Sequence, residues 1–185
     1  MAFEEKTLHS ELVFRGQLVN LRKDEVETVD GTSFREIVEH CPGAAIVALK
    51  EDGSVIMERQ YRKPLEGVAY EIPAGKVEPG EEPLKAAIRE LKEETGYTAD
   101  KMRFLTAAYP TIGYCTEKLF FYLATGLCPG ETNLDPNESI DIEEVPFEKV
   151  LSQVMRGETI DAKAQIGILM TNELIRSGEL EDYLK

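Results

Sequence analysis

The sequence predicts an α+β fold in which a mixed β-sheet lies between helices. Strand-like runs dominate the first half of the 185-residue chain, and helical patterns appear at three places. Strands and helices do not alternate regularly, which argues against a purely parallel sheet. The length fits one domain, and a hydrophobic content of 42% is enough for a buried core.

Four strand-like segments form two pairs, and each pair flanks an Asp-Gly dipeptide, a strong signal for a hairpin turn. The pairs are 18–29 with 33–40 around Asp30-Gly31, and 44–49 with 55–61 around Asp52-Gly53. Pro42-Gly43 breaks the chain between the pairs. We therefore expect an N-terminal antiparallel hairpin in residues 1–42 and the main domain in residues 43–185. Further strands are predicted at 68–72, 103–108 and 118–124.

Helices are predicted at 82–95, 147–156 and 162–177. In the first, Pro83 stands where a proline is tolerated in the first turn, and Gly96 stands where a C-terminal cap is expected. Its apolar residues recur at helical spacing, which favours a helix. These residues are Leu84, Ala87, Ile88 and Leu91.

The charge balance and the cysteines restrict the partners. Lys and Arg number 21 against 35 Asp and Glu, a formal net charge of −14, so we expect no binding to nucleic acid. Three cysteines, Cys41, Cys115 and Cys128, argue against a disulfide framework or a zinc site and favour a cytoplasmic protein. The polar N-terminus has no signal-peptide core, and no apolar run is long enough to span a bilayer, so we expect no membrane partner.

Three glutamates of the first predicted helix carry the chemical information. Glu90, Glu93 and Glu94 are spaced i, i+3 and i+4, so they share one face. Carboxylates crowded in this way repel one another unless they face solvent or a cation compensates them. Hard divalent cations such as Mg²⁺ take carboxylate oxygens together with water and substrate phosphates. The turn-rich loop before the helix can add backbone carbonyls to such a site, and Arg89 can pair with a glutamate such as Glu81.

The alternative is a solvated surface helix rich in Glu and Lys, which Glu93-Glu94 alone would favour. The full pattern argues against it. It comprises Gly75, five residues, Glu81, seven residues, Arg89-Glu90, a bulky apolar residue, any residue, Glu93-Glu94, any residue, Gly96 and a bulky residue. Its probability of arising by chance in the chain is at most on the order of one in a million.

This pattern resembles the Nudix box at every charged and glycine position; Tyr97 stands where an aliphatic residue is more usual. The resemblance implies the Nudix fold and hydrolysis of a nucleoside diphosphate linked to another group, with Mg²⁺ or Mn²⁺ as cofactor. It further implies that Glu90, Glu93 and Glu94 bind the metal, joined by the carbonyl of Ala74. Box residues with a structural role would be Gly75, Glu81, Arg89 and Gly96.

Segments outside the box resemble the ADP-ribose pyrophosphatase branch of the family. They are 35–38, 60–64, 71–75 and 109–113, the last followed by Glu117. Thr111-Ile112-Gly113 departs from the Ser-Pro-Gly more usual in that branch. The branch implies a small-molecule substrate, ADP-ribose, and the products AMP and ribose 5-phosphate. One alternative is another nucleotide-sugar pyrophosphatase, for example one acting on GDP-mannose. A non-catalytic Nudix-like ligand sensor is another, but it should show a damaged box and a basic DNA-binding domain.

The same resemblance suggests substrate-binding residues. Arg62 would grip a phosphate or stack on adenine, although a lone arginine is usually solvated. Arg35 would hold the adenine end, in some members from across a dimer, or else is an ordinary charge at a strand edge. Glu71 would accept a ribose hydroxyl, and Glu117 would contact the terminal ribose.

The general base and the oligomeric state stay open at this point. Glu138, in an acidic loop, matches a glutamate that closes over the metals in the branch, while Glu93 or Glu94 on the helix is the alternative base. The branch also implies a homodimer built through the N-terminal strands. A hairpin that only covers its own sheet is the competing interpretation.

Overall fold

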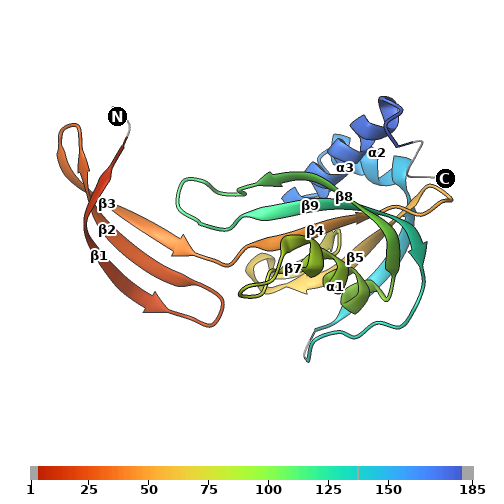
Figure 1. The fold of residues 1–185 in the computed structure, drawn as a ribbon, viewed down its shortest axis with the longest axis horizontal. Coiled ribbons are helices and arrows are strands. Elements are labelled where there is room, and N and C mark those ends of the chain that lie inside the picture. Colours follow the sequence, from red (N-terminus) through yellow and green to blue (C-terminus); the bar gives the residue numbers. More distant parts are fainter. Residues whose placement is uncertain (1–3, 137, 181–185) are drawn as a thin grey trace. The chain divides into compact units, whose positions relative to one another are not determined.

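A computed structural model describes residues 4–136 and 138–180 of the chain (Figure 1). Its contacts divide the described chain into two compact units, residues 4–42 with 108–119 and residues 43–107 with 120–180. The α+β class is confirmed, with strands and helices in the order β1 Lys6–Arg15, β2 Asn20–Thr28, β3 Gly31–Glu39, β4 Gly43–Ala48, β5 Ser54–Arg62, the 3₁₀ turn η1 Lys63–Leu65, β6 Gly67–Glu71, β7 Ala74–Lys76, α1 Pro83–Thr95, β8 Thr98–Ala108, β9 Leu119–Cys128, β10 Ile140–Pro146, α2 Phe147–Met155 and α3 Ala162–Arg176.

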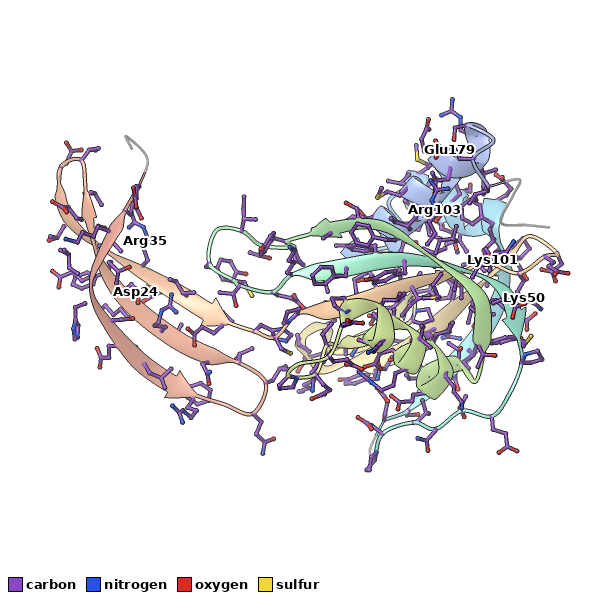
Figure 2. All side chains as sticks on the ribbon, viewed as in Figure 1. Asp24, Arg35, Lys50, Lys101, Arg103 and Glu179 are labelled. Atoms are coloured by element: carbon purple, nitrogen blue, oxygen red, sulfur yellow. The ribbon has the colours of Figure 1, made fainter. Side chains whose placement is uncertain are left out.

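The first unit is a three-stranded antiparallel sheet in the order β1-β2-β3, not the two-stranded hairpin that the sequence predicts. The hairpin of β2 and β3 is present around Asp30-Gly31, but β1 was missed. All ten residues of β1 are exposed and two register irregularities interrupt its pairing, so no clean two-residue pattern marks it. It is attached through backbone pairing and through the buried Asp24, which accepts hydrogen bonds from Ser10 and Arg22 (Figure 2).

Residues 108–119 also belong to this unit. The Val38 N–H donates to the carbonyl of Tyr114 at 2.7 Å, and the Thr116 N–H donates to the carbonyl of Val38 at 2.9 Å. Val38 and Cys115 form an isolated parallel bridge. The segment between β8 and β9 is therefore bound to β3.

The second unit contains a sheet of order β7-β4-β9-β8 and a sheet of order β10-β5-β6. The hairpin predicted for 44–49 and 55–61 is wrong, because β4 and β5 lie in different sheets. Only a single bridge, Leu49 with Val55, joins them across the turn. All six residues of β4 are buried, which is typical of a central strand with a layer on each face.

Helices α1 and α3 supply those two layers. Alternate side chains of a strand point to opposite faces. Ile46 belongs to the cluster that includes Ala87 and Leu91 of α1. On the other face, a Cβ at Gly167 of α3 would lie 2.7 Å from Val47 Cγ2, so a glycine is needed for this close approach. The predicted sheet between helices is thereby confirmed.

Helix α1 follows the predicted signals closely. Pro83 lies in its first turn, and Gly96 caps its C-terminus at φ 76°, donating to the carbonyl of Lys92 at 2.9 Å. Strand β8 instead begins at Thr98, earlier than the predicted 103, because it is an edge strand whose polar residues face solvent. Arg103 of β8 pairs with Glu179 beyond α3 at 2.8 Å (Figure 2). None of the helices in the described residues is both long and apolar enough to cross a membrane.

Candidate active site

The three box glutamates project from α1 beside the short strand β7. Glu94 is 5% exposed, and its Oε2 accepts a hydrogen bond of 2.9 Å from the backbone N–H of Ala74. A Cβ at Gly75 would lie 2.0 Å from Cδ of Glu90, so only glycine allows the carboxylate of Glu90 to lie against this strand. The loop and the helix are thus fitted to one another around carboxylate groups.

Arg89 ties the helix to the loop. Its Nε and Nη2 donate to the two carboxylate oxygens of Glu81 at 3.1 and 3.0 Å, and Nη2 also donates to the carbonyl of Lys76 at 2.9 Å. Its Nη1 donates to Glu90 at 2.7 Å and to Glu93 at 2.9 Å. The pair expected between Glu81 and Arg89 is present, and the same guanidinium also neutralises part of the charge on the helix face.

A second row of polar side chains lies on β5. Glu58, Gln60 and Arg62 alternate along the strand and share one face. Arg62 donates from Nε and Nη2 to the two oxygens of Glu71 at 2.6 and 3.0 Å, a bidentate pair. Gln60 Nε2 donates to Glu138 Oε1 at 3.3 Å, so Glu138 is placed beside this row.

Two residues that belong to this cluster, Lys163 and Glu58, were not identified from the sequence. Lys163 donates from Nζ to Glu71 at 2.7 Å and to Asp161, the N-cap residue of α3, at 2.8 Å. Nothing in the sequence near Lys163 signals that contact, since it joins segments far apart in the chain. Glu58 did leave a signal, because it follows the apolar run 55–57 directly, and a charged residue there is unusual in a buried strand.

The electrostatics of the buried carboxylates differ according to their partners. For Glu71, burial opposes ionisation, but the hydrogen bonds from Arg62 and the charge of Lys163 outweigh it and lower its pKa. For Glu94, burial raises the pKa, and repulsion from Glu58 and Glu90 raises it further. Burial also raises the pKa of Glu58, to about 8. Glu71 is therefore stabilised as a carboxylate by two cations. For Glu58 the charges of Arg62 and Lys163, and for Glu94 the N–H of Ala74, do not outweigh burial and repulsion.

This donor set fits a divalent cation. Glu58 Oε1 is buried and has no hydrogen-bond partner among the described residues, and hard cations take such oxygens. Among residues 4–136 and 138–180, however, no three His, Cys, Asp or Glu side chains already converge on one point. Arg89 instead takes up oxygens of Glu90 and Glu93. Binding a cation would therefore require these two glutamates to exchange a guanidinium partner for the metal.

Glu138 lies at the end of the loop before β10. Its backbone N–H donates to the carbonyl of Asp135 at 3.0 Å, and its Oε2 accepts from the N–H of Asp135 at 3.3 Å. The side chain is thus held by its own turn and by Gln60. Its neighbour Asn137 lies outside the described residues.

The structure places Arg35 and Glu117 in the first unit, whereas the carboxylate cluster belongs to the second. Arg35 (Figure 2) donates from Nε to Glu5 at 2.8 Å. It also lines a hollow of about 480 Å³ whose other walls include Phe34 and Tyr114. Glu117 lies 3.6 Å from Nδ1 of His40. Within their unit, both side chains therefore have local partners.

Known proteins are similar to this chain over most of its length. The NUDIX domain family model matches residues 39–164. An ADP-ribose pyrophosphatase of Bacillus subtilis (strain 168) is 43% identical over 170 residues, which cover 90% of this chain and 92% of the relative. A methanol dehydrogenase activator of Bacillus methanolicus is 40% identical over 169 residues, 90% of this chain and 91% of that protein.

A solved structure, described as the crystal structure of an ADP compounds hydrolase, has the same fold. It superposes with a TM-score of 0.86 at 22% sequence identity and covers 96% of this chain and 97% of that one. The chain therefore belongs to the Nudix family of hydrolases.

Proposed function

We propose that this Nudix hydrolase cleaves ADP-ribose to AMP and ribose 5-phosphate with Mg²⁺ as its cofactor, which Mn²⁺ can replace. The observation that carries the proposal is the carboxylate face of α1 fitted against Gly75, where the Glu90 side chain occupies the space that any Cβ would need. The similarity of this chain, over 90% of its length, to an ADP-ribose pyrophosphatase supports ADP-ribose as the substrate. The three free cysteines are consistent with a reducing cytoplasm.

Glu90, Glu93 and Glu94 would hold the cation, with the carbonyl of Ala74 as a fourth ligand. A divalent cation at this place neutralises phosphate oxygens and orients the attacking water. In hydrolysis, the water oxygen forms a bond to one phosphorus, the bond from that phosphorus to the bridging oxygen breaks, and the bridging oxygen leaves with the other phosphate. A protein carboxylate must take the proton that the water gives up.

We propose that Glu138 is the carboxylate that accepts this proton. It lies beside the β5 row, held by Gln60 and by Asp135, and it has no part in the Arg89 network that occupies the helix carboxylates. Glu93 is the alternative base, because it is on the same helix face and carries a single ion pair, to Arg89 at 2.9 Å. Its use as a base would compete with its use as a metal ligand.

Arg62 and Glu71 would position the substrate. Glu71 uses its two oxygens to hold Nε and Nη2 of Arg62, which leaves Nη1 to donate to a phosphate oxygen. The bidentate pair thus fixes the guanidinium plane before substrate arrives. A carboxylate oxygen has a second acceptor site, so Glu71 can still accept a ribose hydroxyl. Arg35 and Glu117 would serve the adenine end and the terminal ribose, respectively.

A substrate panel tests this function. Purified protein with Mg²⁺ should release phosphatase-sensitive phosphate from ADP-ribose at a higher kcat/KM than from GDP-mannose. Chelation should abolish the release, and AMP and ribose 5-phosphate should appear in equal amounts. A preference for GDP-mannose would shift the assignment to another nucleotide-sugar pyrophosphatase, and binding without hydrolysis would indicate a ligand sensor.

We also propose a homodimer formed through the N-terminal unit. Its sheet exposes several large apolar side chains, whose burial would stabilise association; they are Leu8, Leu12, Val13, Phe14, Leu18 and Phe34. The full-length protein should sediment as a dimer. Leu12→Lys should weaken the dimer, whereas the control Met155→Lys, at an exposed apolar residue of α2, should not. Truncation at Gly43 is a poorer test, because it would also remove the partners of residues 108–119.

Mixing inactive variants tests whether Arg35 serves the partner's site. Glu94→Gln chains keep Arg35, and Arg35→Ala chains keep the helix carboxylates. If subunits exchange freely, about one quarter of the sites in the mixture would be complete and activity would rise on mixing. A dimer with no rise would confine Arg35 to its own chain or remove its role, and a monomer would contradict the proposed assembly.

A further inference from the structure

Glu58 is an ionisable residue in the buried part of β5, where the preceding residues are apolar. It follows Val55, Ile56 and Met57, all fully buried, and is itself 3% exposed. Its neighbours across the sheet are Glu71 on β6 and Ile142 on β10. An ionised carboxylate is rarely buried in such a strand unless something pairs with it.

The described residues supply no such partner for Glu58. Its Oε1 has no hydrogen bond among the described residues. The two nearby cations, Arg62 and Lys163, hydrogen-bond to Glu71, and Lys163 also to Asp161. They act on Glu58 through their charge alone. Glu94 is in a similar state, since the N–H of Ala74 is its one hydrogen bond in the described part of the chain. Within residues 4–136 and 138–180, two buried carboxylates are thus left without an ion pair.

Glu58 shares its face of β5 with Gln60 and Arg62, so it belongs to the candidate active site. The next two side chains on its face, Gln60 and Arg62, reach Glu138 and Glu71. Ile56, which precedes Glu58 on the same face of β5, packs in the cluster that includes Ala87 and Leu91 of α1. This face of β5 is therefore turned toward the helix that carries Glu90 and Glu94.

We propose that Glu58 is a further ligand of the divalent cation, in addition to the three glutamates of the Nudix box. A proton would neutralise one of the two buried carboxylates, whereas a divalent cation neutralises both. Mg²⁺ usually keeps several waters in its shell, so a further carboxylate from β5 would take the place of one of these waters. The inference rests on the proposed function in that this cation is the one required for hydrolysis.

The test is a Mn²⁺ titration of the nucleotide-free protein, followed by electron paramagnetic resonance. We expect Glu58→Gln to weaken Mn²⁺ binding by about tenfold or more, or to remove one bound equivalent. Glu51→Gln, an exposed glutamate in the turn before β5, is the matched control and should bind as the wild type does. Unchanged affinity and stoichiometry in Glu58→Gln would overturn the proposal.

Thermal unfolding separates a ligand from a structural residue. In chelator, Glu58→Gln should unfold at the same or a higher temperature than the wild type, because the substitution removes a buried charge without a partner. Mg²⁺ should then stabilise the variant less than the wild type. A variant less stable in chelator but with the full Mg²⁺ shift would show a structural role and contradict the proposal. Glu58→Met, similar in size and apolar, should give the same two results if glutamine is poorly tolerated.

These measurements do not depend on the substrate. If the wild type binds Mn²⁺ and Glu58→Gln does so weakly, Glu58 is a ligand even when ADP-ribose is not cleaved, and only the assigned substrate fails. If ADP-ribose is cleaved and Glu58→Gln binds Mn²⁺ normally, the role of Glu58 fails and the proposed function stands.

Discussion

Replacing Glu94 by glutamine is expected to lower kcat for ADP-ribose by about 10³-fold. Loss of a ligand from a catalytic cation removes several kcal/mol of transition-state stabilisation, and ~4 kcal/mol corresponds to about this factor. Glutamine keeps the shape of the side chain and an oxygen for the N–H of Ala74, so the fold should persist. The measurements are steady-state kinetics with Mg²⁺ and thermal unfolding in chelator, where the variant should be as stable as the wild type or more so.

A glutamate at the start of the same helix provides the control. Glu82 is the N-cap residue of α1, its side chain makes no capping hydrogen bond, and it is exposed. Glu82→Gln should retain the wild-type rate. Full activity in Glu94→Gln would refute the assignment of the cation to this helix face.

Replacing Glu138 by glutamine is expected to lower kcat by about 10²- to 10⁴-fold, the usual contribution of a general base. The effect on KM should be much smaller, because a base acts on the water in the transition state and not on the bound substrate. Its affinity for Mn²⁺ should stay near that of the wild type, which distinguishes a base from a metal ligand. The measurements are the separate values of kcat and KM and a Mn²⁺ titration.

The competing base on the helix predicts the opposite pattern. If Glu93→Gln loses turnover with unchanged Mn²⁺ binding while Glu138→Gln is near wild type, the proton goes to the helix. Glu131, an exposed residue of the loop that leads to Glu138, is the control position. Glu131→Gln should be indistinguishable from the wild type in both kinetics and metal binding.

The local parts of this protein could be predicted from the sequence. Helix α1 has the predicted Pro83 and Gly96 at its ends, the turn at Asp30-Gly31 joins β2 and β3, and the pair of Glu81 with Arg89 is present. Each depends on residues close together in the chain or on a motif with constant spacing. Backbone preferences and the i, i+3, i+4 geometry of a helix act over such distances, so these features leave a readable pattern.

Only the tertiary structure decided which distant segments meet. The turn at Asp52-Gly53 joins β4 and β5 without making them a hairpin, because β4 is needed at the centre of another sheet. The ion pairs that Glu71 makes with Arg62 and Lys163 likewise follow from strand order and from the placement of α3. So does the lack of an ion-pair partner for Glu58 in the part of the chain that the structure describes. Charge compensation is a property of the assembled site. A sequence pattern shows that a carboxylate is present, whereas its burial and its partners are set by elements that pack together from far apart in the chain.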